Sequence, residues 1–313
     1  MKGHPSNSAL NRAMTELSLA LIQPAPVETI ADLILRDALK LTRSPHGFVG
    51  YIDPITGYLI CPTFSGEIWE ACKIENKTAQ FTERRGLWGW VLNERQSLRL
   101  NTPKEDPRSS GVPRGHLNIK RFLAAPAIIG DSLMGILTLA NARHHYTERD
   151  QQVCERLAAV LAITLQRKFI EAALVESEQR YRALFHHAAD AIFIYDLSGQ
   201  LIEVNEVACQ RLDYSQEEFR QMHISHIEQA PDPSTNGDLF QVLLSEKSCF
   251  YETIHIRKDG SAIPVEINSR LVDYSGRQAV LSMARDITLR KKVEQDLRQS
   301  REQAKFVIGL INE

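Results

Sequence analysis

The sequence predicts an α+β protein of two domains, each with an antiparallel sheet flanked by helices, and with long helices that join the domains and end the chain. Three observations support this prediction. A length of 313 residues exceeds what one hydrophobic core usually organises. The order helix, short strands with turns, helix occurs twice along the chain. A charged stretch with helical spacing follows each set of strands, at residues 155–180 and 289–313.

The first half begins with helical spacing and changes to short strands. Residues 1–24 predict an N-terminal helix, which Pro24 and Pro26 separate from a second helix. The strands FVGYID and GYLICPTF are joined by DPITG, and RFLAAPAII and LMGILTLAN are joined by GDS. At YTERD the helical period returns, with Thr147 as the expected N-cap. This helix should exceed 30 residues, and so long a helix with a narrow apolar seam usually pairs with another helix.

The second half repeats the plan. IFIYDLSGQLIEVN predicts two strands around a turn, and Asn205 can cap the short helix that follows. Three more strands are joined by KDGS and YSGR, where Asp-Gly suits a tight hairpin. Pro264 predicts an edge strand or a bulge. In the last helix Leu289, Val293 and Leu297 begin a nearly heptad seam, which favours a parallel dimer over the alternative of an ordinary amphipathic helix.

The composition argues against several classes of protein. A net charge of −2 gives no general attraction to nucleic acid or anionic lipid. No run approaches the roughly 18 apolar residues of a membrane span, and the N-terminus lacks the features of a secretory signal. A cytoplasmic protein is therefore expected. The five cysteines are odd in number and form no CxxC, which favours reduced thiols over disulfides or a simple zinc site.

The segment at residues 86–150 contains GLWGWVLNERQSLRLNTPKEDPR, FLAAPAIIGDSLMGILTLAN and YTERD in this order. It resembles the second half of a GAF domain, and the resemblance extends over residues 25–165. GAF domains enclose a small-molecule pocket, and the resemblance places Arg114, His116 and Asn118 near it. In GLWGW, Trp88 and Trp90 should lie on the first turn of a helix over residues 89–95 and point to different faces. One ring could then line the pocket or its rim while the other packs in the core, although packing alone could account for both rings.

Residues 177–290 resemble a PAS domain. The resemblance rests on ESEQRYRALFHHAADAIFIYDLSGQLIEVN, LDYSQEEF, RKDGSAIPVE and the closing Asp286-Ile287-Thr288. PAS sequences often have Gly where this chain has Asp213, so an altered local turn is expected there. The resemblance makes Tyr195 and Asn205 candidates for the pocket. It also implies that residues 286–288 couple the last strand to the exit helix.

The motifs of several cofactors are missing from the sequence. RGHLNIKRFL has Gly115 where a covalently bound bilin would need a cysteine before the histidine. No GxNCRFLQ segment marks a flavin site, and no histidine occurs in DPSTNGDLFQVLL, where haem-binding PAS domains place one. The cofactor therefore stays unassigned. His223 and His226 could share a metal, but surface histidines without a metal are the alternative favoured for this pair.

A GAF domain followed by a PAS domain resembles the front of a bacterial histidine kinase or cyclic-di-GMP enzyme. We therefore expect a signal-sensing module that binds a small molecule or a partner in one or both pockets. Coiled-coil helices of a homodimer would pass the change to an output domain, with a histidine kinase favoured. One alternative is a dimerising scaffold whose pockets are filled by their own side chains. A GAF-fold methionine sulfoxide reductase using Cys61 and Cys72 is a weaker alternative, because Trp88 occupies the position of a required thiol, and no enzyme activity is expected in this segment.

Overall fold

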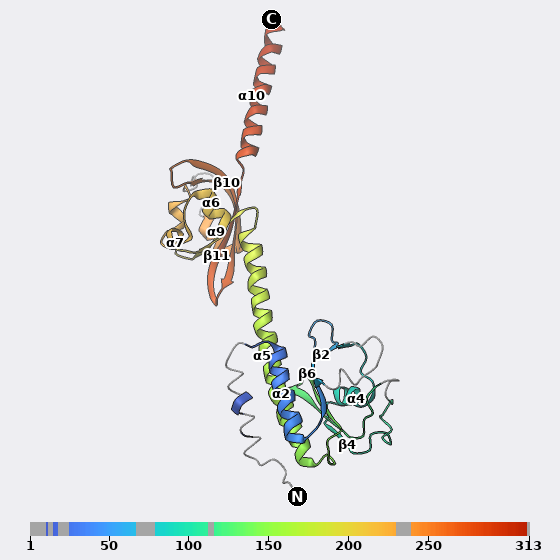
Figure 1. The fold of residues 1–313 in the computed structure, drawn as a ribbon. Coiled ribbons are helices and arrows are strands. Elements are labelled where there is room, and N and C mark those ends of the chain that lie inside the picture. The colour runs from blue at the N-terminus through green and yellow to red at the C-terminus, as the bar shows by residue number, and fades with distance from the viewer. Residues whose placement is uncertain are drawn as a thin grey trace. The chain divides into compact units, whose positions relative to one another are not determined.

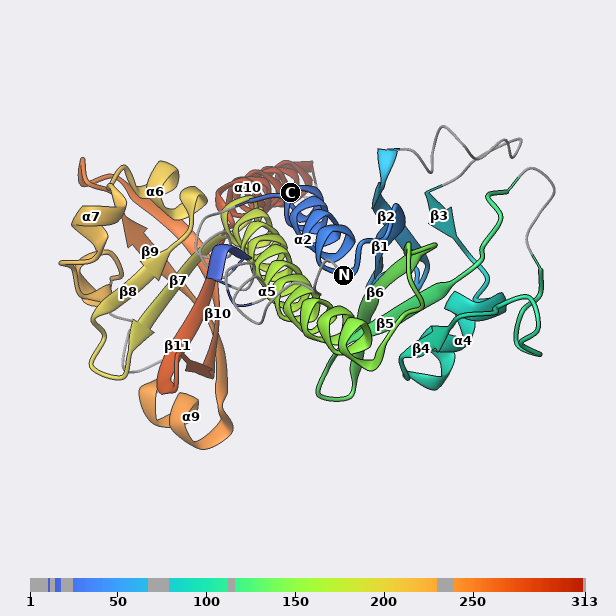
Figure 2. The same ribbon diagram turned by 60° about the horizontal axis from the view of Figure 1, so that its bottom comes forward.

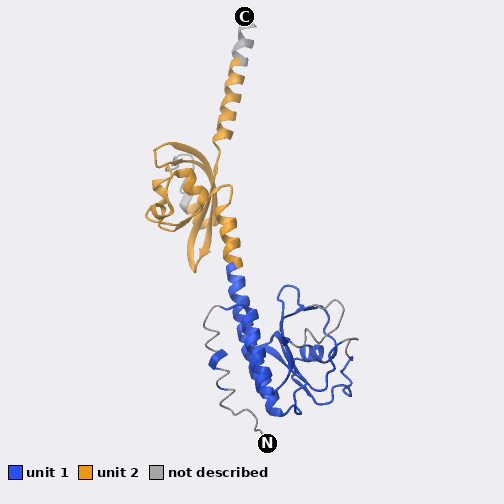
Figure 3. Ribbon diagram, viewed as in Figure 1, with its two compact units in different colours: residues 1–175 blue, residues 176–313 orange. Residues whose placement is uncertain are grey.

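The structure is a computed structural model that describes residues 25–66, 79–111, 116–229 and 239–311, with residue 11 and residues 15–17 (Figure 1). The chain divides into two compact units, residues 1–175 and 176–313 (Figure 3). Most of the N-terminal helix expected at residues 1–24 lies outside the described residues. Within the described ranges, no helix is long and apolar enough to cross a membrane.

The first unit contains a six-stranded antiparallel sheet with the order β3-β2-β1-β6-β5-β4. Its strands are β1 (His46–Ile52), β2 (Leu59–Phe64), β3 (Gln80–Phe81), β4 (Leu98–Leu100), β5 (Phe122–Ile129) and β6 (Ser132–Ala140). The two expected hairpins are confirmed as the pairs β1–β2 and β5–β6. β1 also pairs with β6, so the two hairpins join into one continuous sheet.

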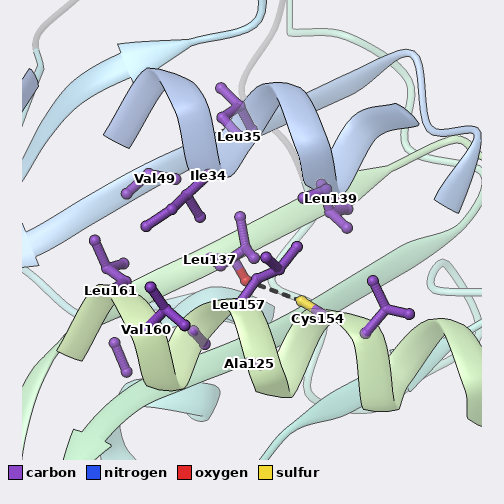
Figure 4. Packing of buried hydrophobic residues seen from close by; sticks show 14 of the residues in the cluster. Ile34, Leu35, Val49, Ala125, Leu137, Leu139, Cys154, Leu157, Val160 and Leu161 are labelled. Carbon is purple, nitrogen blue, oxygen red and sulfur yellow. Dashed lines mark hydrogen bonds between the residues drawn. The ribbon is translucent and has the colours of Figure 1, made fainter. Parts of the chain in front are cut away.

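Helices cover both faces of this sheet. Figure 2 shows α2 (Val27–Thr42) and α5 (Glu148–His186) on one side and α4 (Gly86–Glu94) on the other. Alternate residues of β6 point to opposite faces. Leu137 and Leu139 pack with α2 and α5 in the main core, where the Sγ of Cys154 lies 3.8 Å from the carbonyl oxygen of Leu137 (Figure 4). Ile136 packs with α4 in a second, smaller cluster.

The second unit contains a five-stranded antiparallel sheet with the order β8-β7-β11-β10-β9. Its elements are β7 (Ala191–Asp196), β8 (Leu201–Val204), α6 (Glu206–Leu212), α7 (Gln216–Phe219), η1 (Ile224–His226), α9 (Leu239–Glu246), β9 (Ser248–Ile256), β10 (Ala262–Tyr274), β11 (Arg277–Asp286) and α10 (Thr288–Ile311). The short helices cover one face, where Phe193, Phe219 and Val265 form part of the core. The three strands expected around KDGS and YSGR are confirmed.

Local capping follows the sequence closely. The Thr147 hydroxyl accepts a hydrogen bond from the Asp150 amide at the start of α5, and that helix runs for 39 residues. Asn205 caps α6 by accepting from the Ala208 amide at 3.0 Å. Both caps were expected, because a side-chain oxygen satisfies an amide that the first helical turn leaves without a partner.

Two expectations in the second unit need correction. Asp213 does not alter its turn: it adopts the left-handed conformation, with φ of 62°, that favours glycine and that Asp tolerates better than most residues. Pro264 lies neither on an edge strand nor at a bulge, because β10 is an inner strand. Its carbonyl accepts from the Ile287 amide just beyond the end of β11, so the missing amide of Pro264 falls where the ladder has already ended.

Candidate functional site

The two glycines of GLWGW are required by the backbone. Gly86 begins α4 with φ of +64°, a conformation that residues with a Cβ rarely adopt. A Cβ on Gly89 would lie 2.3 Å from the carbonyl carbon of Arg84, which no real contact allows. The helix therefore begins three residues earlier than the expected residue 89, at Gly86.

The two tryptophans of this helix have different neighbours. Trp88 lines a cavity, and its ring lies 5.5 Å from that of Phe81. Trp90 is not among the residues that line the cavity; the Arg108 guanidinium lies 4.5 Å from its ring centroid. Arg108 in turn donates two hydrogen bonds to Asp106, and these hold the pKa of Asp106 down at about 2. Of the two tryptophans, only Trp88 can contact a ligand in this cavity.

The cavity has a volume of about 660 Å³ and is bounded by the sheet and α4. Its apolar lining is largely aromatic and comes from strands and helix far apart in sequence, namely Phe48, Phe64, Phe81, Trp88 and Phe122. Its polar lining consists of Arg85, Lys104, Ser109, Ser110, His116, Asn118 and Thr138. An apolar cavity of this size with a few polar groups is typical of a small-molecule site.

Thr138 is the most unusual polar residue of this lining. It lies in the middle of β6 with 4% of its surface exposed, and its hydroxyl has no hydrogen-bond partner in the described part of the chain. A buried hydroxyl without a partner is costly, so such groups usually have a ligand or water as partner. Sequence analysis did not single out Thr138, although it is the only polar side chain in the apolar run LMGILTLA.

Two of the three GAF candidates taken from the family resemblance lie at the cavity. His116 and Asn118 line the cavity. The Nδ1 atom of His116 lies 2.8 Å from the Leu117 carbonyl oxygen, and the Asn118 carbonyl accepts from Asn141. Arg114 lies outside the described residues.

In the second unit, the polar side chains of the inner sheet face bond to one another. Tyr195 shares a hydrogen bond of 2.9 Å with Ser282, which shares one of 2.5 Å with Ser269. Burial raises the pKa of Tyr195. The three hydroxyls thus form a row across β7, β11 and β10, the inner strands of the sheet.

Asn205 has a structural role rather than the expected pocket role. Its Oδ1 accepts from the amides of Ile192 and Ala208, and its Nδ2 donates to the carbonyls of Phe185 and Asp190. The residue is fully buried. Because both its oxygen and its amino group bond to the backbone, Asn205 ties the end of α5 to β7 and α6 and has no group left to offer a ligand.

Two titratable groups, the buried His255 near the end of β9 and the half-buried Glu228 beside it, lie next to each other in this unit. His255 is 1% exposed and neither ring nitrogen has a partner among the described residues. Burial and, to a lesser extent, Arg211 lower its pKa to about 4, so the ring is neutral at pH 7. Its ring packs edge-on against Phe193 at 5.4 Å. Burial raises the pKa of Glu228 to about 6, against the opposing effect of a hydrogen bond with Tyr251.

The connection from β11 to α10 is held by polar contacts. Asp286 Oδ1 accepts from the Thr288 amide at 2.8 Å, at the start of the helix. Arg290 then contacts Glu252 of β9 and Glu266 of β10, and Lys291 lies 2.6 Å from Glu252. These contacts tie the first turn of α10 to two strands of the sheet.

The cysteines and histidines that sequence analysis considered for catalysis or metal binding have the following surroundings. Cys61 is buried, and burial raises its thiol pKa, which disfavours a nucleophilic thiolate; Cys72 lies outside the described residues. In the described ranges, no group of three or more His, Cys, Asp or Glu side chains could hold a metal ion. The Nε2 of His223 lies 2.5 Å from the Ser198 carbonyl oxygen, and the Nδ1 of His226 accepts from the His223 amide.

Family models match both sheet-containing parts of the chain. A GAF domain model matches residues 24–166, and a PAS domain model matches residues 189–289. A methyl sulfide methyltransferase-associated sensor of Methanosarcina acetivorans is 32% identical over 167 residues, which are 53% of this chain and 17% of that protein. An uncharacterized protein of Azorhizobium caulinodans is 26% identical over 55% of this chain and 24% of its own length. The chain thus spans less than a quarter of either curated relative.

Solved structures show likeness to each half separately. The GAF domain of a phosphoenolpyruvate-protein phosphotransferase from Coxiella burnetii is 19% identical, with a TM-score of 0.46, over 54% of this chain and 99% of that structure. The PAS domain of an HTR-like protein from Haloarcula marismortui is 28% identical, with a TM-score of 0.35, over 38% of this chain and 99% of that structure.

Proposed function

Because the chain carries a GAF domain at residues 24–166 followed by a PAS domain at residues 189–289, we propose that it is the sensory input region of a signalling protein. In this proposal the GAF cavity binds a small molecule, and the PAS domain relays the change to α10. The output domain of the full-length protein is a histidine kinase or a related signalling enzyme. This region itself performs no catalysis.

The observation that carries the proposal is the GAF cavity itself. Its volume of about 660 Å³ suits a small molecule, its apolar walls are largely aromatic, and its lining includes Thr138, whose buried hydroxyl has no partner among the residues that the structure describes. A scaffold whose interior were filled by its own side chains would have neither the space nor the unpaired hydroxyl. The binding function is therefore favoured over the scaffold alternative.

The route of the signal follows the chain connections. β6 provides Thr138 on the cavity floor, and its end is followed by α5 after a short loop. At the other end of the chain, Asp286 and Arg290 connect the PAS sheet to α10. The signal requires that the sheet exist in two states. A ligand shifts the equilibrium between these states only if it binds them with different affinities.

We further propose that the chain acts as a parallel dimer. Large apolar side chains are exposed along both long helices: Ile163, Ile170, Leu174 and Leu184 on α5, and Leu289, Val293 and Leu297 on α10. Ile170 and Leu289 are 62% and 76% exposed. A seam of this kind on long helices is what a second copy of the same helix covers in a coiled coil.

The test is mass spectrometry of small molecules released when the purified protein is denatured. We expect a stoichiometric metabolite from the native protein and none from Ala140→Phe, since Ala140 lines the cavity and a phenyl ring there would fill it. Ser132→Phe is the matched control, because Ser132 lies on the same strand but is exposed. A dimer that releases no metabolite and binds none would instead support the scaffold.

A further inference from the structure

The walls of the GAF cavity offer aromatic surface on two sides. Phe48 and Phe64 come from neighbouring strands, with ring centroids 5.9 Å apart and planes tilted by 37°. Trp88 of α4 and Phe81 of β3 form a second pair at 5.5 Å. All four rings are only half-buried although they lie inside the domain. A flat aromatic ligand would cover these ring faces and gain both apolar burial and ring contacts.

Thr138 of β6, which we call the floor of the cavity, has a hydroxyl without a hydrogen-bond partner among the described residues. Across the sheet, Thr138 is paired with Phe48 on β1 and Ala124 on β5, both apolar. Its hydroxyl can donate and accept, and no described residue does either for it. A ligand that bonds to this hydroxyl needs a polar substituent at the end that reaches Thr138.

The charge of the lining favours an anion. Arg85 and Lys104 line the cavity, and its described lining contains no Asp or Glu. Arg85 forms an ion pair with Glu83 at 2.8 Å, whereas Lys104 forms no ion pair within the described part of the chain. Lys104 is exposed and Thr138 is buried, so the cation and the hydroxyl lie at different depths. An acid group near Lys104 would meet an unneutralised ammonium.

From these three features we infer that the GAF cavity binds a flat aromatic acid that carries a hydroxyl or similar substituent at the end remote from its acid group. The ring system lies between the aromatic walls, the acid group lies toward Lys104, and the substituent bonds to Thr138. The volume leaves room for at least two fused rings. This inference rests on the proposed function of the cavity as a ligand site and specifies the chemistry of the ligand.

The first arm of the test measures charge preference by isothermal titration calorimetry on the full chain. The probes share one bicyclic ring: 6-hydroxy-2-naphthoate is an anion, 2-naphthol is neutral and 2-naphthylmethylamine is a cation. We expect the naphthoate to bind at least about tenfold more tightly than the other two, because a charge-assisted contact is formed by the anion alone. Lys104→Met should remove this advantage. Lys120→Met, at an exposed lysine of the same domain that does not line the cavity, should keep it.

The second arm measures the bond to Thr138. We expect 6-hydroxy-2-naphthoate to bind about tenfold more tightly than 2-naphthoate, which lacks the substituent. Thr138→Val should abolish this difference without weakening 2-naphthoate, whereas Thr138→Ser, which retains a hydroxyl, should restore it. An unchanged preference in Thr138→Val would overturn the assignment of Thr138.

The outcomes separate the ligand class from the function of the cavity. Equal or tighter binding of the neutral or cationic probe would show that the ligand is not an acid, while the cavity would remain a binding site. The absence of binding by all three probes, together with release of a non-aromatic metabolite from the purified protein, would show that the ligand is not a flat aromatic acid, while the cavity would again remain a binding site. No probe binding and no released metabolite would contradict both proposals.

Discussion

The polar side chain at the GAF cavity and those on the inner face of the PAS sheet differ in their hydrogen-bond partners. In the GAF domain Thr138 lines a cavity, and its hydroxyl has no partner among the described residues. In the PAS domain Tyr195, Ser282 and Ser269 bond to one another, and Asn205 bonds to four backbone groups. A buried polar group that is bonded within the fold stabilises it, whereas one without a partner carries a cost that a bound water or ligand can remove. This difference supports the proposal that the GAF domain binds the ligand and the PAS domain relays the signal.

Among the substitutions that test this comparison, Asn205→Ala should have the largest effect on stability. It leaves two amides and two carbonyls of the PAS core without partners, which should destabilise that domain by about 4 kcal/mol. Hydrogen exchange measured by mass spectrometry resolves the two domains, which is needed because a two-domain chain need not unfold in one step. Gln278→Ala, at an exposed PAS position, is the control. Unchanged protection of the PAS strands would mean that its polar groups are not structural.

His255 is an exception in the PAS interior, since both its ring nitrogens lack partners among the described residues. Its folded pKa of about 4 lies below the ordinary value of 6.5. The neutral ring therefore contributes stability above pH 6.5 that is lost as the pH falls toward 4, because the unfolded chain then binds the extra proton. The shift corresponds to about 3 kcal/mol.

The measurement for His255 is the free energy of unfolding of the PAS domain at pH values from 4 to 7, in the native protein and in His255→Leu. Glu228 acts in the opposite direction, since its raised pKa means that stability is lost as the pH rises through about 6. The difference between the two proteins cancels Glu228. A flat difference across this range would mean that His255 has a partner in solution, and the contrast between the domains would be weaker.

Asp286→Ala tests the relay role. The substitution removes the acceptor for the Thr288 amide while leaving the GAF cavity untouched. We expect an output response to ligand about tenfold weaker in the full-length protein, with ligand affinity of the GAF domain unchanged, since coupling energies between sites are typically of this size. Asp273→Ala, which alters a turn of the same sheet, is the control. A full response in Asp286→Ala would remove this connection from the signal route.

Thr138→Val should have the smallest effect on stability. The informative result is whether it raises or lowers the stability of the ligand-free GAF domain. Removing an unsatisfied buried hydroxyl should stabilise the ligand-free GAF domain by about 1 kcal/mol, the reverse of the loss expected for Asn205→Ala. Thermal unfolding of the ligand-free protein, with domain-resolved hydrogen exchange, measures it. Destabilisation would show that the hydroxyl already has a structural partner, and the contrast between the domains would disappear.

The agreement between sequence and structure is best where the interactions are local. The hairpin at residues 257–261, the cap at Asn205 and the length of α5 all depend on residues a few positions apart. The two incorrect expectations also concern local structure, but their outcome depends on the backbone conformation and on where the neighbouring strand ends. Asp213 accepts a left-handed conformation, and Pro264 lies in an inner strand beyond the end of its neighbour. Neither exception can be recognised without knowing which strand ends where.

The sequence by itself determined the two domains, their order, most of their strands and the long helices, because periodicity and turn chemistry act over short distances. The resemblance to a family also predicted Arg114, His116 and Asn118 near a pocket, and His116 and Asn118 line the GAF cavity. Only the tertiary structure decided that Thr138 lines that cavity without a hydrogen-bond partner among the described residues and that Asn205 is fully used by the backbone. Both depend on which strands become neighbours, since partners such as Phe48 and Thr138 are far apart in the chain and meet only through the β1–β6 pairing.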